Sequence, residues 1–266
     1  MTAILGISAF YHDSAAAIIL DGKIIAAAQE ERFTRIKHDY SFPTMAIDFC
    51  LKQAGVTSKE IDHVVFFEKP FSKFDRLLKT SLQGFPKTYW MFNQSMRTWL
   101  FDKLWIKSLI TTELDIDKEK ILFCEHHISH AASAYFCSPF EESAILTFDG
   151  VGEWATTTIG YGKGTHLEIE NEMHFPHSIG LLYSAFTAFL GFEVNEGEYK
   201  VMGMAPYGSP KYVDEVRKII KTNKDGSFWL DTSYLSFHYS TKNSFSKKFT
   251  RLFGEPRDPD VPFFTQ

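Results

Sequence analysis

The sequence of 266 residues is poor in cysteine, carries no excess of positive charge and contains no long apolar run. Its three cysteines lack CxxC spacing and stand in hydrophobic stretches, which indicates reduced, buried thiols in a cytoplasmic protein. The formal net charge of −5 excludes a chain that binds nucleic acid as a polycation. The longest stretch without a charged side chain, residues 173–192, is interrupted by Pro176 and Gly191. Since a spanning helix needs about 20 mostly apolar residues, we expect a buried helix there and no membrane association.

The sequence does contain a repeated order of elements on a globular composition of 44% apolar and 23% charged residues. Three apolar strands followed by a helix are expected twice, first at 3–8, 14–20, 23–29 and 43–55, and again at 143–149, 154–161, 165–172 and 178–190. Asp21-Gly22 is a strong hairpin turn in the first unit, and the glycines at 162 and 164 supply one in the second. The duplication predicts two related α/β lobes whose loops between the first and second strand point into a common cleft.

Several segments lie outside this repeat. Short strands are expected at 64–67 and 120–124 and helices at 127–136 and 211–222, whereas residues 30–42 are charged and irregular. Residues 70–110 combine basic and aromatic side chains, and we interpret them as an inserted helical hairpin with its aromatic rings on the sheet and its lysines in water. A surface for nucleic acid or lipid is the alternative. No closing strand or helix is expected after residue 222, which indicates a fragment of a longer protein.

Two histidines and one aspartate form a candidate metal site. His126 and His130 stand four residues apart, so on a helix they share a face and can hold one ion, although ordinary surface or capping histidines show the same spacing. The zinc-protease pattern requires glutamate where this chain has His127, which disfavours that class. Asp149 ends a buried strand, where a carboxylate is costly unless it is paired or coordinates a metal; a turn aspartate before glycine is the alternative. Two imidazoles with one carboxylate suit zinc, iron or manganese.

A second candidate site lies in the corresponding loop of the first unit. His12 and Asp13 lie in the loop between the first and second strands, and an imidazole beside a carboxylate is a reasonable general base for an alcohol nucleophile. A turn histidine next to an Asx-type cap is the alternative. The pair therefore predicts catalytic roles for His12 and Asp13.

Anion-binding groups are expected at two further places. Gly150 and Gly152 allow backbone amides to approach an anion such as phosphate, and Glu153 follows in the same motif and is assigned to the cofactor site with them. Lys200 stands in a glycine-punctuated stretch and could meet a phosphate or carboxylate, with a solvated loop lysine as the alternative. The glycines at 160, 162 and 164 lie inside a hairpin and lack the order of a phosphate loop, so we discount them.

Four long motifs, at 4–16, 126–134, 149–154 and 198–208, resemble in order those of the O-carbamoyltransferases of the nodulation protein U and tobramycin carbamoyltransferase type. The resemblance implies a duplicated ribonuclease-H-like fold, as in actin, Hsp70 and sugar kinases, and a likeness to the subunit that transfers threonylcarbamoyl to tRNA. In this family a second, YrdC-like domain uses ATP and Mg²⁺ to convert carbamoyl phosphate to carbamoyl adenylate. The N-terminal domain binds the adenylate at a divalent metal and passes the carbamoyl group to a hydroxyl on a small acceptor, such as a sugar or antibiotic.

The resemblance also assigns residues. Its metal ligands fall on His126, His130 and Asp149, with iron expected first and zinc or manganese as alternatives, and its proposed base falls on His12. Family members are roughly twice as long, so this chain is expected to hold a first lobe at 1–140, with a helical aromatic insertion at about 70–112, and the start of a second lobe at 141–266. The activation domain is expected to lie outside this chain, which alone is not expected to make its own adenylate.

Two rival functions remain open. An ATP-dependent kinase with the actin-like fold would transfer phosphoryl instead of carbamoyl, but such kinases bind Mg²⁺ through carboxylates, which the paired histidines argue against. A nonenzymatic module could instead bind RNA or a protein partner through the basic aromatic segment.

Overall fold

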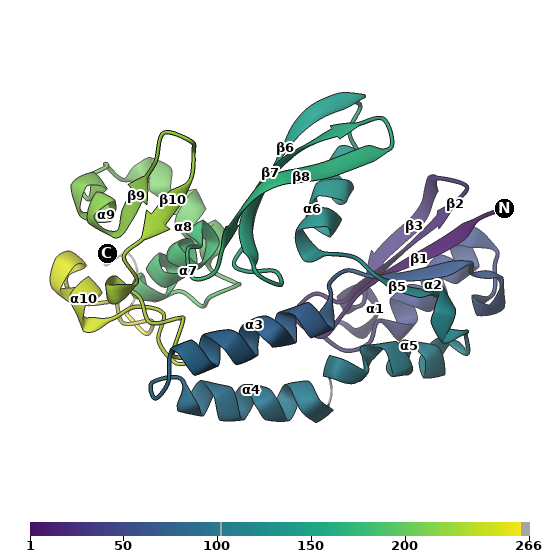
Figure 1. Cartoon of the computed structure of the whole chain (residues 1–266), viewed down its shortest axis with the longest axis horizontal. Coiled ribbons are helices and arrows are strands. Elements are labelled where there is room, and N and C mark those ends of the chain that lie inside the picture. Colours follow the sequence, from purple (N-terminus) through teal and green to yellow (C-terminus); the bar gives the residue numbers. More distant parts are fainter. Residues whose placement is uncertain (102, 262–266) are drawn as a thin grey trace. The chain divides into compact units, whose positions relative to one another are not determined.

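The computed structural model describes residues 1–101 and 103–261, without the side chain of Phe101 (Figure 1). Its contacts divide the chain into two units. Unit 1 comprises residues 1–74 and 96–129, and unit 2 comprises residues 75–95 and the chain from 130 onwards. The lobe boundary expected after residue 140 stays a prediction. No helix in the described part of the chain is long and apolar enough to cross a membrane.

Unit 1 is built on a five-stranded mixed sheet in the order β3-β2-β1-β4-β5. Its strands are β1 (Ala3–Ser8), β2 (Ala15–Leu20), β3 (Lys23–Gln29), β4 (His63–Phe66) and β5 (Ile121–Phe123). The first three are antiparallel neighbours, while β4 runs parallel to β1 and β5 parallel to β4. Alternate residues of β1 are buried, which fixes one face of the strand on the core. The arrangement is the ribonuclease-H-like one that the sequence predicted.

Helices cover this sheet and close the core of unit 1. The helix α2 (Thr44–Ala54) packs against β2 and β3, and α5 (Ile106–Leu114) packs near β5. Gly55 ends α2 in the left-handed conformation, at a φ of 67°, as expected for a C-terminal glycine. A short helix, α1 (Glu31–Thr34), follows β3. The largest fully buried side chains of this core include Phe66, Leu5, Ile18 and Ile47.

The inserted segment is helical, but its side chains are distributed differently from the prediction. It forms α3 (Pro70–Gln83), α4 (Tyr89–Phe101) and then α5. Trp99 is buried, whereas Trp90 and Trp105 are exposed. Lys73 is buried rather than solvated, because its ammonium group pairs with the Glu68 carboxylate at 2.5 Å. The expectation of rings on the sheet and lysines in water is therefore wrong for Trp90, Trp105 and Lys73.

Unit 2 repeats the opening of unit 1. The strands β6 (Glu142–Phe148), β7 (Ala155–Lys163) and β8 (His166–His174) form an antiparallel sheet, and α7 (Ile179–Phe189) follows. The helix α6 (His126–Tyr135) precedes them, and Tyr135 packs on β7. A Cβ atom on Gly162 would stand 2.7 Å from the Tyr135 ring, so this glycine serves close packing. The duplicated strand order and the discounted phosphate loop are both consistent with these positions.

The end of the described chain is structured, which overturns the expectation that no closing strand or helix follows. Beyond residue 222 lie β10 (Phe228–Leu230) and α10 (Lys247–Phe253), and before them come α8 (Glu198–Met204), α9 (Val213–Ile219) and β9 (Ile220–Thr222). The predicted helix at 211–222 ends at Ile219, where the chain turns into β9. Phe249 of α10 is fully buried against rings of α7, including Phe186 and Phe189. These short elements gain their stability from tertiary aromatic packing, which local sequence patterns do not reveal.

Candidate functional site

The helix α6 places the two predicted metal-binding histidines. It is one continuous helix, and the division between the units falls between Ser129 and His130. In its first turn, the Ser129 hydroxyl donates to the carbonyl of Phe67 at 3.0 Å, and the His126 ring lies 5.7 Å from the Phe67 ring. Beyond the division, Ala131 and Tyr135 are buried with Ile145 of β6. His126 and His130 therefore lie one turn apart on the same helix.

Asp149 is held by the N-terminus of α7. Its backbone N–H donates to the carbonyl of Thr156 at 2.9 Å, so the strand pairing extends up to this residue. The Ser178 hydroxyl caps α7 by accepting from the Leu181 N–H, and it lies 3.1 Å from the Asp149 carbonyl oxygen. A Cβ atom on Gly180 would stand only 2.5 Å from that same oxygen. The Asp149 loop thus rests on a tight backbone contact that only glycine permits.

The three predicted ligands come together. The Nε2 atom of His130 lies 3.8 Å from Oδ2 of Asp149, and one possible ligand atom from each of His126, His130 and Asp149 lies within 4.8 Å of the others. A separation of 3.8 Å is too long for a hydrogen bond. It agrees with two ligands of one ion, because ligand atoms bound at about 2.1 Å lie roughly 3–4 Å apart. The His126 side chain is buried and that of His130 is half exposed, so one side of the cluster is accessible.

In unit 1, the loop after β1 contains a carboxylate bridged between two imidazoles. One oxygen of Asp13 lies 2.8 Å from Nδ1 of His12, and the other lies 2.8 Å from Nδ1 of His38. Partial burial raises the pKa of Asp13, but hydrogen bonds from His38 and His12 outweigh it, so that the pKa is lowered overall. Asp13 is consequently ionised at neutral pH and orients both rings.

The irregular segment after β3 fixes His38 in this position. The N–H of Ser14 donates to the carbonyl of Asp39 at 2.8 Å, which ties the two loops together. The Asp39 carboxylate accepts from the Thr34 hydroxyl at 2.8 Å and from the Ser41 N–H at 3.0 Å. Sequence reasoning missed His38, although Asp39 followed by Ser41 is the pattern of an Asx turn and could have marked an ordered loop.

The positions of the four residues assigned to a cofactor site give less indication of that role. The Gly150 N–H donates to Oδ1 of Asp149 at 2.6 Å, and the Gly152 N–H donates to the Ala155 carbonyl at 2.9 Å. Binding of an anion at these amides would require both bonds to break. Glu153 is half-buried in the same loop, and Lys200 is exposed on α8, with its ammonium group 5.8 Å from the centre of the Tyr199 ring. Their roles toward a cofactor stay predictions.

Fold and site together define a ribonuclease-H-like α/β protein with a candidate metal cluster. Residues 3–259 match the family described as carbamoyltransferase N-terminus, and the chain belongs to this family. It is 54% identical over 98% of its length to the uncharacterised protein sll1178 of Synechocystis sp., of which it covers 44%. It is 38% identical over 76% of its length to nodulation protein NolNO of Sinorhizobium fredii, of which it covers 28%. The chain thus spans less than half the length of these curated relatives.

Among solved structures, YeaZ from Pseudomonas aeruginosa aligns with 65% of this chain and 65% of its own chain, at a TM-score of 0.36 and 13% identity. Likeness at this level says nothing about function.

Proposed function

We propose that this chain contributes to O-carbamoyl transfer, in which a carbamoyl group passes from carbamoyl adenylate to the hydroxyl of a small acceptor. The observation that carries the proposal is the cluster of His126, His130 and Asp149 in a chain of the carbamoyltransferase family. We assign the formation of the adenylate from carbamoyl phosphate, ATP and Mg²⁺ to the part of the relatives that this sequence does not cover. This chain then supplies the metal ligands and the proton acceptor.

The donor set of the cluster fits a divalent metal. Two imidazoles and one carboxylate suit iron, which we expect first, and also zinc or manganese. An ion held by His126, His130 and Asp149 would polarise the carbamoyl carbonyl and orient the phosphate of the adenylate. The close contact with Gly180 fixes the Asp149 backbone, and the Gly150 N–H holds one oxygen of its carboxylate. The half-exposed His130 leaves an approach for the substrate.

His12 is the proposed base for the acceptor hydroxyl. Its Nδ1 faces the Asp13 carboxylate, so the proton lies on Nδ1 and the exposed ring can accept a second proton at Nε2. The ionised Asp13 then stabilises the imidazolium that forms. His38 is a positioning residue, because its Nε2 atom is buried while the His12 side chain is 47% exposed. In this proposal His12 is exposed to the acceptor, and His38 holds the Asp13 carboxylate in place.

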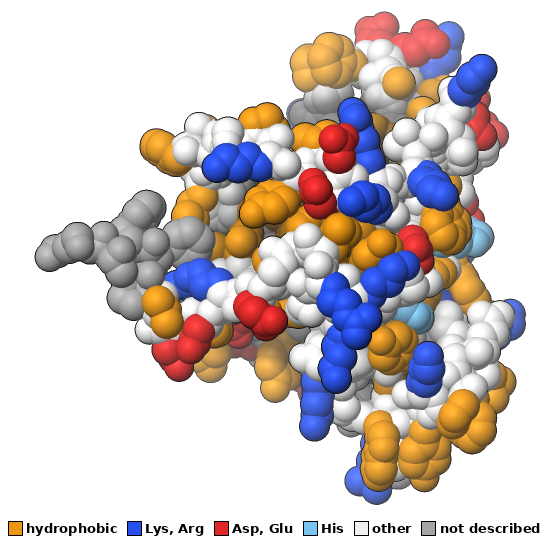
Figure 2. Space-filling model, turned by 90° about the vertical axis from the view of Figure 1, so that its left-hand side faces the viewer, with side chains coloured by type: hydrophobic (Ala, Val, Ile, Leu, Met, Phe, Trp, Pro, Cys, Tyr) orange, Lys and Arg blue, Asp and Glu red, His pale blue; other side chains and the backbone are white. Residues whose placement is uncertain are grey.

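The rival functions find less support. A kinase of the same fold would gain nothing from paired histidines, since Mg²⁺ prefers oxygen ligands. For the RNA-binding module, the face drawn in Figure 2 shows Lys and Arg interspersed with acidic and apolar side chains. Such a mixture gives weak attraction to a polyanion.

Metal analysis of the full-length protein tests the proposal. We expect purified wild-type protein to contain close to one equivalent of divalent metal, and His130→Ala to lose it. His166→Ala is the matched control, because His166 is an exposed histidine of unit 2 that lies on β8 outside the cluster. Full metal content and full carbamoyl transfer in His130→Ala would refute the ligand assignment. Equal loss in both variants would show a general effect of removing a histidine and would also refute it.

A further inference from the structure

The hydroxyl group of Ser178 joins the first turn of α7 to the loop that follows β6. It lies 2.7 Å from the carbonyl oxygen of Gly150 and 3.1 Å from that of Asp149, and it donates its proton toward them. The same oxygen accepts from the Leu181 N–H at 3.0 Å, which caps the helix. Ser178 is fully buried, so water does not compete for these bonds. One side chain therefore both starts the helix and holds the loop.

The peptide group between Asp149 and Gly150 transmits this contact to the Asp149 carboxylate. Its N–H, which belongs to Gly150, donates to Oδ1 of Asp149 at 2.6 Å, while its carbonyl oxygen faces Ser178. The second carboxylate oxygen, Oδ2, lies 3.8 Å from Nε2 of His130. Because a peptide group is planar and rigid, a shift of its carbonyl end also moves its N–H. The direction of the carboxylate thus depends on how this peptide group is held.

Two further residues hold the same peptide group closely. A Cβ atom on Gly180 would stand 2.5 Å from the oxygen and 2.6 Å from the carbon of the Asp149 carbonyl, and 2.8 Å from the nitrogen of Gly150. Thr156 is buried, its carbonyl accepts from the Asp149 N–H at 2.9 Å, and its hydroxyl donates to the His177 carbonyl at 2.6 Å. The strand end and the residue before the helix cap are therefore linked by a second route.

The corresponding helix of unit 1 is capped in a different way. The carboxylate of Glu30 accepts from the Met45 N–H at 3.1 Å and from the Ala46 N–H at 2.8 Å at the start of α2. Glu30 follows β3 and does not belong to the loop that contains Asp13. Capping of the repeated helix therefore does not require a bond to the aspartate loop. The bonds of Ser178 to that loop indicate a role in addition to capping.

We propose that Ser178 is a positioning residue for the metal-binding carboxylate of Asp149. Its hydroxyl acts through the Asp149–Gly150 peptide group and keeps the carboxylate turned toward the ion that His130 would share. Groups that hold a metal ligand in place typically contribute 10- to 100-fold to metal affinity. The inference rests on the proposed metal site and extends that site to the first turn of α7.

Metal affinity in the full-length protein tests the inference. Zn²⁺ alone is the probe, because it suits the same donors and is not oxidised. We expect Ser178→Ala to weaken Zn²⁺ binding about 10-fold or more, measured by competition with a chromophoric chelator in metal-depleted protein. Ser178→Gly separates the two roles of the side chain. Glycine is nearly as good a helix cap as serine, so the helix start should persist while the affinity falls as in Ser178→Ala.

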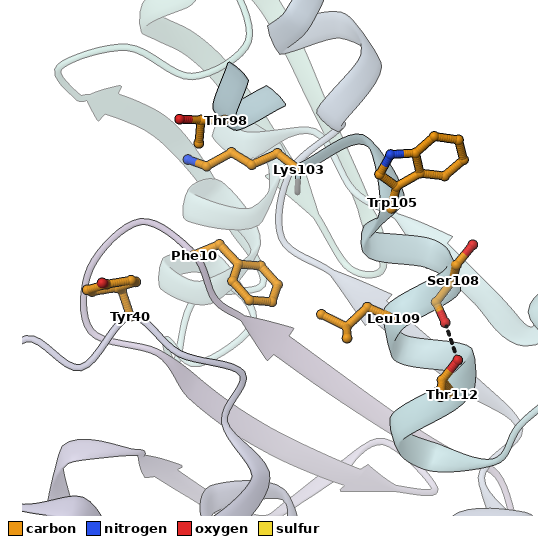
Figure 3. Close-up of a pocket in the computed structure, with 8 residues that line it drawn as sticks. All are labelled: Phe10, Tyr40, Thr98, Lys103, Trp105, Ser108, Leu109 and Thr112. Atoms are coloured by element: carbon orange, nitrogen blue, oxygen red, sulfur yellow. Dashed lines mark hydrogen bonds between the residues drawn. The ribbon is translucent and has the colours of Figure 1, made fainter. Parts of the chain in front are cut away.

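Two other serines provide controls. Ser246 caps α10 by accepting from the Lys248 N–H at 3.2 Å, and its hydroxyl donates to the Ser233 carbonyl at 2.8 Å. Ser246→Ala should therefore lower the Tm by about 2–4 °C, as expected for a lost cap, but leave Zn²⁺ affinity unchanged. Ser108 lies within α5 and lines a cavity of unit 1 (Figure 3). Ser108→Ala should change neither quantity. Equal weakening of Zn²⁺ binding in the Ser178 and Ser246 variants would overturn the inference.

Hydrogen exchange of the Gly150 amide in metal-free protein separates this inference from the proposed function. We expect protection to fall in both Ser178 variants and to stay unchanged in Ser246→Ala. Unchanged protection in the Ser178 variants would overturn the inference whether or not the protein binds metal, and so would reduced protection with full Zn²⁺ affinity. A wild-type protein that binds no metal, with protection that still depends on Ser178, would instead refute the ligand assignment in the proposed function.

Discussion

Two aspartates follow the first strand of the repeated unit, and the chain holds them in different ways. Asp13 in unit 1 has both carboxylate oxygens at 2.8 Å from imidazole nitrogens, one from His12 and one from His38. Asp149 in unit 2 has one oxygen on the Gly150 amide, and its other oxygen is 3.8 Å from His130. The first distance is that of a hydrogen bond, whereas the second is too long for one and agrees with the spacing expected of two ligands around one ion.

The difference shows that corresponding loops of a repeated unit can hold an aspartate in two ways. The repeated unit has an aspartate in the loop between its first and second strands both times: Asp149 directly follows β6, and Asp13 lies shortly before β2. In unit 1 the carboxylate orients His12 from its own loop and His38 from a neighbouring loop. In unit 2 the histidine comes from a helix that packs on the sheet, at a distance that a hydrogen bond cannot span. The same residue type thus becomes an orienting group in one unit and a candidate ligand in the other.

The largest expected effects come from replacing each of the two aspartates with asparagine, which tests the comparison directly. We expect Asp149→Asn to lose bound metal, because a neutral amide oxygen is a weaker ligand than a carboxylate. Asp13→Asn should keep the metal and lower turnover of the full-length protein about 100-fold or more, since it removes the carboxylate that orients the proposed base His12. Metal analysis and carbamoyl-transfer assays of both variants check this. The comparison fails if Asp13→Asn loses metal or if Asp149→Asn retains it.

A methyl group on Gly180 should disturb only the unit 2 aspartate. Its Cβ would lie 2.5 Å from the Asp149 carbonyl oxygen, so Gly180→Ala should displace that loop, destabilise the protein by about 1–3 kcal/mol and weaken metal binding. Gly203→Ala is the control, because Gly203 lies on α8 with open space around its Cβ position. That variant should be unchanged or more stable by about 0.5–1 kcal/mol. Urea unfolding and metal content measure both, and equal behaviour of the two variants would contradict the close contact.

His38→Asn should disturb only the unit 1 aspartate. It removes the first of two hydrogen bonds that lower the pKa of Asp13, so this pKa should rise toward the ordinary value of 3.8. Turnover should fall about tenfold through lost orientation, less than for His12→Asn, which removes the base itself. Carbon-detected titration of the Asp13 carboxyl group measures the change in pKa. His63→Asn, at an exposed position on β4, is the control, and an unchanged Asp13 pKa in His38→Asn would show that His38 does not position this carboxylate.

Local patterns predicted most of the fold and part of the site. The apolar run that forms β1 and the turn at Asp21-Gly22 are determined by neighbouring residues, and the structure confirms both the strand and the turn. His126 and His130 were found because helical spacing is local, and Asp149 was added because the strand repeat placed it. The structure brings these three side chains together. Their role as ligands remains a prediction.

What was missed depends on contacts between distant segments. His38 meets Asp13 across 25 residues of chain, and no periodic pattern marks that encounter. Gly180 looks like an ordinary helix glycine until its contact with the Asp149 carbonyl is known. The helix α10 contains only seven residues and is stabilised by buried Phe249 among rings from α7. Each of these features is set by tertiary packing, which overrides local propensity.

The smallest expected effect is a difference in acid sensitivity between the units. Burial lowers the pKa of His177 in unit 2, and its Nδ1 accepts a hydrogen bond from the Leu230 N–H at 3.2 Å, which protonation would break. Below pH 6.5 the unfolded chain therefore binds more protons than the folded chain, so the stability of unit 2 falls as the pH drops through this value. Because the pKa of Asp13 is lowered in the folded chain, its contribution to the stability of unit 1 persists until the pH falls below about 3.8.

Hydrogen exchange at pH 7.5 and 5.5 should therefore show protection lost around β10 and α7 before it is lost around the Asp13 loop. His177→Gln should reduce this loss, because the amide oxygen can accept from Leu230 at either pH. His174→Gln, at an exposed neighbouring position on β8, should leave the loss unchanged. Loss of protection that begins in unit 1, or that is the same in both variants, would show that the buried histidine does not make unit 2 the more acid-sensitive of the two.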